Sequence, residues 1–195
     1  MMIKKIFTYL LLGISLCLSA TAQAEDYVID TKGMHAFIEF KVKHLGYSWL
    51  LGRFNKFDGT FSYDEKNPEK SKVQINVDIA SLDSNHAERD KHLRSKDFFN
   101  VSKYPKASFV SLGYVNKGNG NGILTGKFTL RGVTKDIAID VQQIGAGKDP
   151  WGGYRRGFMG KTTLHLSDYN MAKANILGPA AENVELALYI EGIRK

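Results

Sequence analysis

The sequence has few of the residues that cross-link a chain or anchor it in a membrane. Its 195 residues include a single cysteine, Cys17, and only four prolines. Beyond the N-terminus, no segment approaches the roughly 18 consecutive apolar residues of a membrane-spanning helix. There is no Cys/His cluster and no His-Glu-x-x-His pair. We therefore expect no transmembrane segment, no disulfide, no metal and no cofactor.

The one long apolar run lies at the N-terminus and has the form of a signal peptide. Lys4 and Lys5 precede an apolar stretch over residues 6–18, and Ala22-Gln23-Ala24 supplies small residues at a cleavage site. We predict that residues 1–24 are removed by cleavage after Ala24. The mature protein is then periplasmic, and residues 25–195 form a single domain.

Two other readings of the N-terminus are less favoured. A retained anchor would need a longer run, and polar Thr21 and Gln23 interrupt this one. Lipoprotein processing at Cys17 would need a small residue before the cysteine, where the sequence has Leu16.

The charge of the chain is mildly basic. The formal net charge of +7 falls to +5 once Lys4 and Lys5 are removed. An exported protein does not meet the chromosome, so we expect no nucleic-acid partner. Attraction to anionic lipid headgroups or cell-surface polymers is more plausible.

Apolar and polar residues alternate along most of the remaining sequence. This period of two is typical of strands with one buried face and one wet face. Val73, Ile75 and Val77, for example, alternate with polar neighbours. The pattern predicts eight strands, at His35–Lys43, Gly52–Tyr63, Lys72–Ile79, Lys106–Val115, Leu124–Leu130, Asp136–Gln142, Phe158–Leu166 and Val184–Ile190.

Turn residues join these strands in sequence order. Asn119-Gly120-Asn121-Gly122 predicts a tight hairpin, and Arg131-Gly132 predicts another. Closing an eight-stranded antiparallel sheet into a barrel removes its edges and leaves an interior large enough for one ligand. We therefore predict an all-β, eight-stranded antiparallel barrel, with a bulge between Phe54 and Phe57.

One segment of the chain is not strand-like. Asn85 and Glu88 have the spacing of a helical capping box. We predict a short helical insertion around residues 85–100, with Asn85 as the N-cap.

The polar face of the strands predicts which side of the barrel is wet. It carries mid-strand charges that would be costly against lipid, so it faces water and the apolar face points inward. These charges are Glu39, Lys41, Asp78, Lys127, Asp140 and Lys161. Periodicity alone does not decide whether the interior is a packed core or a ligand cavity.

If the interior is a cavity, large inward-facing side chains are the candidate ligand contacts. Two aromatic loops, around Trp49 and Trp151, would lie near an end and discriminate the headgroup. The candidates are Phe40, Val42, Trp49, Phe57, Phe61, Ile75, Phe109, Phe128, Ile139, Trp151, Phe158, Leu164 and Leu186.

Signs of catalysis are weak in this sequence. There is no Gly-x-Ser-x-Gly elbow and no cysteine nucleophile in the predicted mature chain. We interpret Arg89, Asp90 and His92 as a polar network that ties the helix to the rim of the barrel. A catalytic role for them is the alternative. His86 and Asp90, four residues apart, are only weak candidates for a metal site.

Several sequence blocks together resemble the YceI family of bacterial periplasmic proteins. They keep the order of the family along the predicted mature chain. The blocks are His44-Leu45-Gly46-Tyr47-Ser48-Trp49, Asp58-Gly59-Thr60-Phe61, residues 85–95, Gly132-Val133-Thr134-Lys135, Asp149-Pro150-Trp151-Gly152-Gly153 and Leu177-Gly178-Pro179-Ala180.

The resemblance implies an extended lipocalin-like barrel whose lumen contains a polyisoprenoid lipid, such as an isoprenoid quinone precursor. It implies a binding protein, and no catalytic residues are carried over with it. An enzyme acting on a lipid intermediate and a ligand-free, stress-related interaction protein are the alternatives. Exposed Phe37 and Tyr189 could support a homodimer or could be scattered surface residues.

Overall fold

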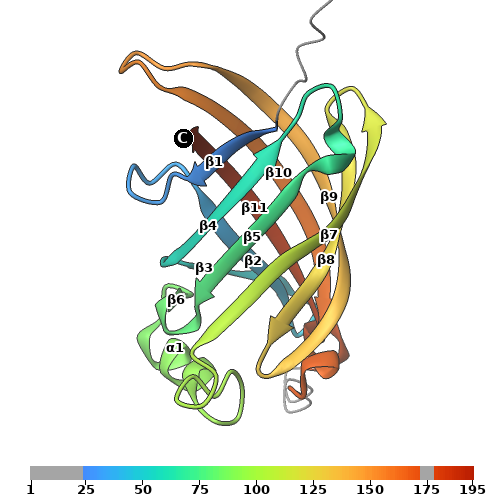
Figure 1. Ribbon diagram of the computed structural model, residues 1–195. Coiled ribbons are helices and arrows are strands. Elements are labelled where there is room, and N and C mark those ends of the chain that lie inside the picture. The colour runs from blue at the N-terminus through green and yellow to red at the C-terminus, as the bar shows by residue number, and fades with distance from the viewer. Residues whose placement is uncertain (1–23, 172–177) are drawn as a thin grey trace, which may run out of the picture.

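The computed structural model describes residues 24–171 and 178–195, which form one antiparallel barrel (Figure 1). Residues 1–23, which belong to the predicted signal peptide, lie outside the described residues. The strands are β1 (Glu25–Ile29), β2 (Phe37–His44), β3 (Ser48–Phe54), β4 (Phe57–Tyr63), β5 (Lys72–Asp78), β6 (Leu82–Asp83), β7 (Lys106–Gly118), β8 (Asn121–Leu130), β9 (Val133–Lys148), β10 (Tyr154–His165) and β11 (Asn183–Arg194).

These strands occupy eight positions around the barrel, because three positions are built from two strands each. The long strand β11 pairs with β2 through residues 184–189 and with β1 through residues 192–194. In the same way, β3 and β4 share the next position, where β3 pairs with β2 and β4 pairs with β1. Strands β6 and β5 share the third position, where β6 pairs with β3 and β5 pairs with β4. The pairing of β1 with both β4 and β11 closes the barrel. The predicted eight-stranded antiparallel fold is confirmed.

The strands of these divided positions begin and end at other residues than the sequence predicted. The strand predicted over Gly52–Tyr63 is divided at Asn55–Lys56, where the bulge was expected. The strand predicted to reach Ile79 ends at Asp78, whose carboxylate accepts a hydrogen bond from the backbone N–H of Ala80 and starts a 3-10 turn. Strand β1 was not predicted.

Both predicted hairpin turns are present. Asn119 and Gly120 have φ values of 51° and 75°, and Arg131 and Gly132 have values of 50° and 76°. Two successive positive φ angles define the type I′ turn that suits twisted antiparallel strands. These turns connect β7 to β8 and β8 to β9.

The predicted helix is α1 (Ala87–Arg94), but its predicted cap is wrong by one residue. His86 is the N-cap, and its Nδ1 accepts a hydrogen bond from the backbone N–H of Arg89 at 3.1 Å. Asn85 instead takes a left-handed φ of 61°, which asparagine tolerates better than most residues. Helix α1 lies across one end of the barrel (Figure 1).

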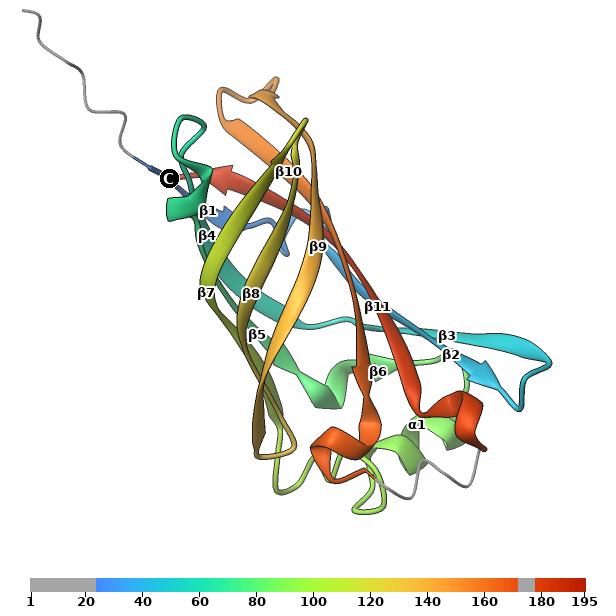
Figure 2. The same cartoon turned by 90° about the vertical axis from the view of Figure 1, so that its right-hand side faces the viewer.

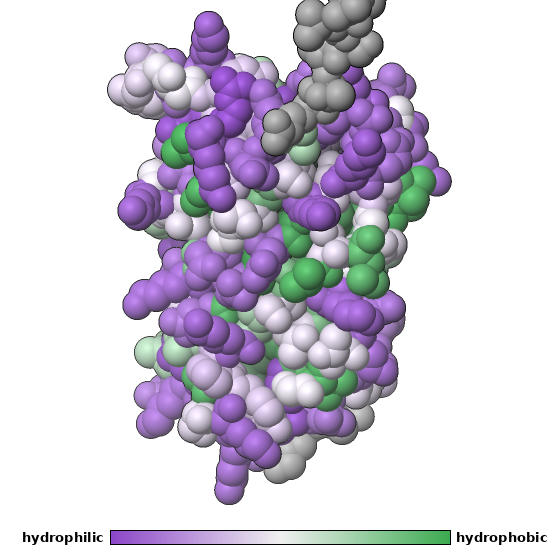
Figure 3. All heavy atoms as spheres, in the orientation of Figure 1, coloured by the Kyte–Doolittle hydropathy of each residue, from purple (hydrophilic) through white to green (hydrophobic). Residues whose placement is uncertain are grey.

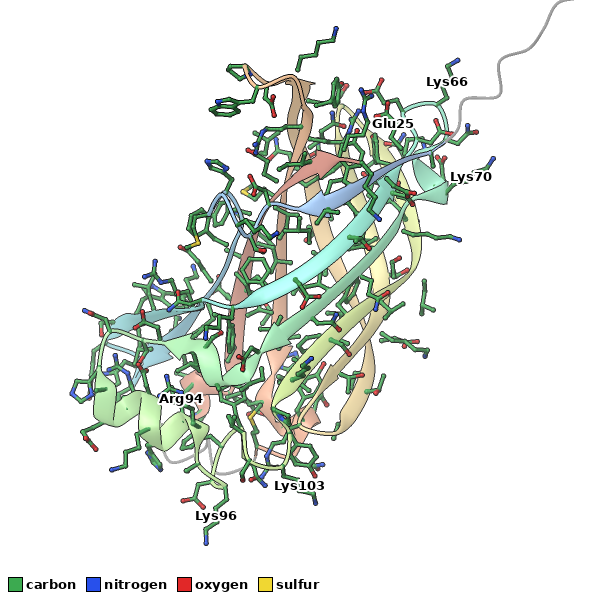
Figure 4. The ribbon with its side chains drawn as sticks, turned by 60° about the vertical axis from the view of Figure 1, so that its left-hand side comes forward. Glu25, Lys66, Lys70, Arg94, Lys96 and Lys103 are labelled. Atoms are coloured by element: carbon green, nitrogen blue, oxygen red, sulfur yellow. The ribbon has the colours of Figure 1, made fainter. Side chains whose placement is uncertain are left out.

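We call the end that carries α1 the lower end, where Arg94, Lys96 and Lys103 lie (Figure 4). The upper end carries Glu25 and the β4–β5 loop with Lys66 and Lys70. The hairpin of β2 and β3 extends away from the barrel wall near the lower end (Figure 2).

The inner and outer faces of the wall differ as predicted. Buried apolar side chains such as Ile38, Phe61 and Ile75 lie on the inner face. The outer face is largely polar with scattered apolar side chains (Figure 3), and ion pairs such as Lys127–Asp136 lie on it. Among the described residues, no helix is long and apolar enough to cross a membrane.

Candidate lipid-binding cavity

The interior of the barrel contains a cavity of about 390 Å³. Every barrel position contributes lining side chains, and most of them are apolar. This size lies within the usual range of small-molecule sites, roughly 300–1,000 Å³. The inner face of the sheet is therefore not a fully packed core, which was the alternative left open by the sequence.

Ten of the thirteen candidate side chains line this cavity. They come from eight strands and from opposite walls, because alternate residues of each strand point inward. The ten are Phe40, Val42, Phe61, Ile75, Phe109, Phe128, Ile139, Phe158, Leu164 and Leu186.

The other three candidates do not line the cavity. Phe57 is partly buried and packs against the core. Trp49 is 43% exposed, and Lys41 Nζ lies 4.3 Å from its ring centroid. Trp151 is 79% exposed, with the Arg155 guanidinium 5.6 Å from its ring centroid. Both tryptophan rings therefore interact with cations on the outer surface, and neither lines the cavity; their role in headgroup discrimination stays a prediction.

The lower end of the cavity is bounded by α1 and by the end of β2. Arg89, His92 and Leu93 of the helix and His44 of β2 line it. His44 and His92 are also exposed to solvent, so the cavity reaches the surface here. The His92 ring meets Phe98 edge-on, with 4.9 Å between centroids.

Arg89 and Asp90 are joined through Ser84, whereas the His92 ring packs against Phe98. Asp90 is buried and accepts hydrogen bonds from both the backbone N–H and the hydroxyl of Ser84. Arg89 donates to the hydroxyl and the carbonyl of Ser84. This network ties α1 to the segment after β6, which is the structural role preferred from the sequence. His86, the other residue of the weak metal pair, caps the helix.

The upper end of the cavity contains polar groups that sequence reasoning did not select. Tyr63, Ser71 and Tyr114 line it. Burial raises the pKa of both tyrosines above the usual value, so their hydroxyls stay protonated and can donate. The only sequence signal for them was the inward position of Tyr63 in the alternation of β4.

Behind Tyr63 lies Arg156, the bulkiest of the almost fully buried side chains, 1% exposed. Its guanidinium carbon lies 4.6 Å from the Tyr63 ring centroid, and its Nη2 donates to Glu65 at 2.5 Å. Its Nε donates to the Tyr27 hydroxyl at 3.2 Å. Burial opposes its charge, yet the hydrogen bonds to Glu65 and Tyr27 raise the pKa of Arg156.

A separate charged cluster lies outside the cavity, between β1, β10 and β11. Asp30, His35 and Glu191 have ligand atoms close enough together for one metal ion. However, Arg155 Nη1 donates to Asp30 at 2.6 Å and to Glu191 at 2.5 Å. The guanidinium already supplies the positive charge that a metal ion would bring, so the cluster is an ion-pair network.

Comparisons with known proteins place this barrel in a family. The profile of the YceI-like domain matches residues 27–192. A UPF0312 protein of Shewanella sp. (strain MR-4) is 55% identical over 192 residues, which are 98% of this chain and 100% of the relative.

Two solved structures have similar barrels. The YceI protein of Campylobacter jejuni is 30% identical with a TM-score of 0.71, over 79% of this chain and 90% of that chain. A polyisoprenoid binding domain from Saccharophagus degradans has a TM-score of 0.62 over 87% of this chain and 98% of that chain, and at 14% identity it shows the fold alone. By its sequence profile and its relatives, this chain belongs to the YceI-like domain family.

Proposed function

We propose that the protein binds a long-chain isoprenoid lipid, such as a polyisoprenoid or an isoprenoid quinone precursor, in the lumen of its barrel. The observation that carries this proposal is the cavity of about 390 Å³, whose lining is apolar along most of its length. An apolar chain gains free energy by leaving water for such a lining. The polyisoprenoid binding named for the Saccharophagus degradans domain supports the same class of ligand.

The expected affinity depends on how much of the chain enters the cavity. Each methylene group taken from water contributes roughly 0.8 kcal/mol, or about a four-fold change in Kd. We therefore expect Kd to fall steeply as a prenyl chain is lengthened, and to level off once the lumen is full. Binding that does not depend on chain length would contradict this mechanism.

The direct test is to identify what the protein carries. The full chain is expressed in a bacterium, purified without detergent, extracted with organic solvent and examined by mass spectrometry. We expect a co-purified prenyl lipid, or uptake of an added one by the stripped protein. Absence of both would refute the proposal, and an unrelated periplasmic protein purified in parallel controls for lipid carried over from membranes.

We also propose that the chain is exported and works in the periplasm as a carrier, store or scavenger of this lipid. The basis is the sequence of residues 1–24, with its cleavage signature before Glu25. N-terminal sequencing of the protein recovered from the periplasmic fraction should begin at Glu25. An intact Met1 in a membrane fraction would contradict it.

An enzymatic role is the rival that the lower end of the cavity raises, because Arg89 and His92 face the lumen. The hydrogen bonds of Asp90 and Arg89 to Ser84 favour a structural role. His92→Ala separates the two, because it removes the imidazole without breaking the Ser84 network. If the role is structural, we expect neither the unsubstituted protein nor the variant to change the lipid chemically during incubation. Turnover by the unsubstituted protein that is lost in the variant would indicate an enzyme.

The homodimer remains a prediction. Phe37 and Tyr189 are cross-strand partners on the outer face, 36% and 41% exposed. Light scattering of the purified protein at several concentrations would measure the oligomeric state.

A further inference from the structure

Two buried polar atoms at the upper end of the cavity have no hydrogen-bond partner among the described residues. They are the Ser71 hydroxyl oxygen and Arg156 Nη1. Leaving such a group unpaired costs about 1–3 kcal/mol, so native structures usually pair them. Ser71 lines the cavity directly, and Arg156 lies against the far side of Tyr63.

The neighbouring phenols add further unpaired donors at the same place. Within the described ranges, neither the Tyr63 nor the Tyr114 hydroxyl makes a hydrogen bond. Both rings line the cavity, and both hydroxyls are protonated at neutral pH for the reason given above. Three residues of this otherwise apolar lining therefore carry hydroxyl groups that have no protein acceptor among the described residues.

We propose that this upper end, formed by Tyr63, Ser71 and Tyr114, is the headgroup subsite, and that it accepts an uncharged oxygen acceptor, such as a carbonyl or ether oxygen. The inference rests on the proposed lipid binding and adds an orientation to it. The headgroup enters first and lies deep in the barrel, and the apolar tail extends toward the lower end.

The charges around the subsite are the reason for preferring an uncharged headgroup. Arg156, the one buried cation within residues 24–171 and 178–195, is already ion-paired with Glu65 at 2.5 Å. Asp64 and Glu69 add negative charge in the same loop and raise the pKa of Tyr63 together with Glu65. Lys66 and Lys70 of this loop point away from the barrel (Figure 4), so their ammonium groups do not face the lumen. A phosphate would therefore be buried without a free counter-ion, which is costly.

The lower end of the cavity is open to solvent, and this is why we place the tail there and not the headgroup. His44 and His92 are exposed at the point where the cavity reaches solvent. Arg89 also lines this end, but its guanidinium already donates to the hydroxyl and the carbonyl of Ser84, so a headgroup placed here would mostly keep its hydration. Apolar Val42, Leu50 and Leu93 line the same end and suit a prenyl tail.

The test compares three probes with equal prenyl chains, which are a prenylated benzoquinone, a prenyl phosphate and the hydrocarbon without a headgroup. Kd is measured for the full protein and for the variants Tyr63→Phe, Ser71→Ala and Tyr114→Phe. Each variant removes one hydroxyl and leaves the surrounding apolar surface intact. Tyr189→Phe, on the outer face, is the matched control.

We expect the quinone to bind more tightly than the phosphate. Each lumen variant should weaken quinone binding by about 5-fold, the value of one hydrogen bond, and leave hydrocarbon binding unchanged. Unchanged quinone binding in all three variants would overturn the inference, as would tighter binding of the phosphate. If no probe binds the unsubstituted protein, the proposed function itself fails. Equal hydrocarbon binding in all variants shows that the barrel is intact.

Discussion

The ion-pair network of Asp30 predicts how stability depends on pH. Asp30 is only 5% exposed, and its carboxylate accepts hydrogen bonds from Arg155 Nη1 at 2.6 Å, His35 Nδ1 at 2.9 Å and the Gly33 N–H at 2.8 Å. Burial alone would raise its pKa. The bonds from His35, Arg155 and Gly33 outweigh burial and lower the pKa of Asp30 from 3.8 to about 2.

The size and sign of the effect follow from this difference. One pKa unit corresponds to about 1.4 kcal/mol, so the lowered pKa contributes about 2 kcal/mol to the free energy of unfolding at neutral pH. Because the folded pKa lies below the unfolded one, the contribution is complete above pH 4. It is lost as the pH falls from about 4 through 2, where the folded carboxylate also takes up a proton.

The substitution Asp30→Asn removes the titrating group and keeps its shape. We expect the free energy of unfolding at pH 7 to fall by about 2 kcal/mol, with a much smaller difference from the unsubstituted protein at pH 2.5. Urea unfolding followed by circular dichroism at pH 7, 4 and 2.5 measures this. The matched control is Asp140→Asn, at an exposed position of β9.

A loss of stability that is equal at all three pH values would refute the reasoning. It would mean that Asp30 contributes through packing and not through its charge. Some pH dependence should remain in the variant in either case, because the pKa of Asp149 is also lowered. Burial alone would raise the pKa of Asp149, but hydrogen bonds from Gly153, Arg155 and Trp151 outweigh it.

Three further substitutions test other parts of the structure. Leu186→Trp places a larger side chain in the lumen, and we expect at least a ten-fold loss of affinity for a long prenyl chain in a direct binding assay; equal affinity would show that the chain binds elsewhere. Gly126→Val should lower the free energy of urea unfolding by about 1–3 kcal/mol, because a Cβ there would lie 2.3 Å from the Phe109 ring, and an unchanged midpoint would contradict this overlap. Asp90→Ala leaves the buried Ser84 N–H without its acceptor and should cost about 1–3 kcal/mol in the same assay; a neutral effect would mean that α1 is anchored otherwise.

The strand pattern could be predicted because it depends only on which face of each residue is wet. Val73, Ile75 and Val77 alternate with polar residues for that reason, and all three line the cavity. Strand β1 escaped prediction because it is only five residues long and directly follows the expected cleavage site. The end of β5 escaped because one side chain, Asp78, bonds to its own backbone and turns the chain.

The lining of the cavity was easier to predict than its two ends. Inward-facing strand residues such as Phe109 and Leu186 follow from periodicity, whereas loop residues do not. Trp49 was a candidate ligand contact, but its ring lies beside Lys41 and Lys43 on the outer face of the β2–β3 hairpin and does not line the cavity. Ser71 lies between a 3-10 turn and β5, where no alternation applies, so no sequence pattern places it in the cavity lining.

The broken strand positions provide a physical reason for where the cavity opens. An eight-stranded barrel is just wide enough for its own side chains or for one small ligand, so the lumen needs no break in the wall to hold a ligand. Here the chain leaves the regular ladder at residues 30–36, 55–56 and 79–81, which lie in adjacent positions of the wall. Below these breaks the β2–β3 hairpin extends outward (Figure 2) and α1 covers the end in place of a strand. His44, Arg89 and His92 line the cavity on this side, and His44 and His92 are exposed to solvent, so we expect the lipid to enter and leave there. A disulfide between α1 and the end of β2 should slow lipid exchange without changing Kd, and unchanged exchange rates would place the entrance at the upper end.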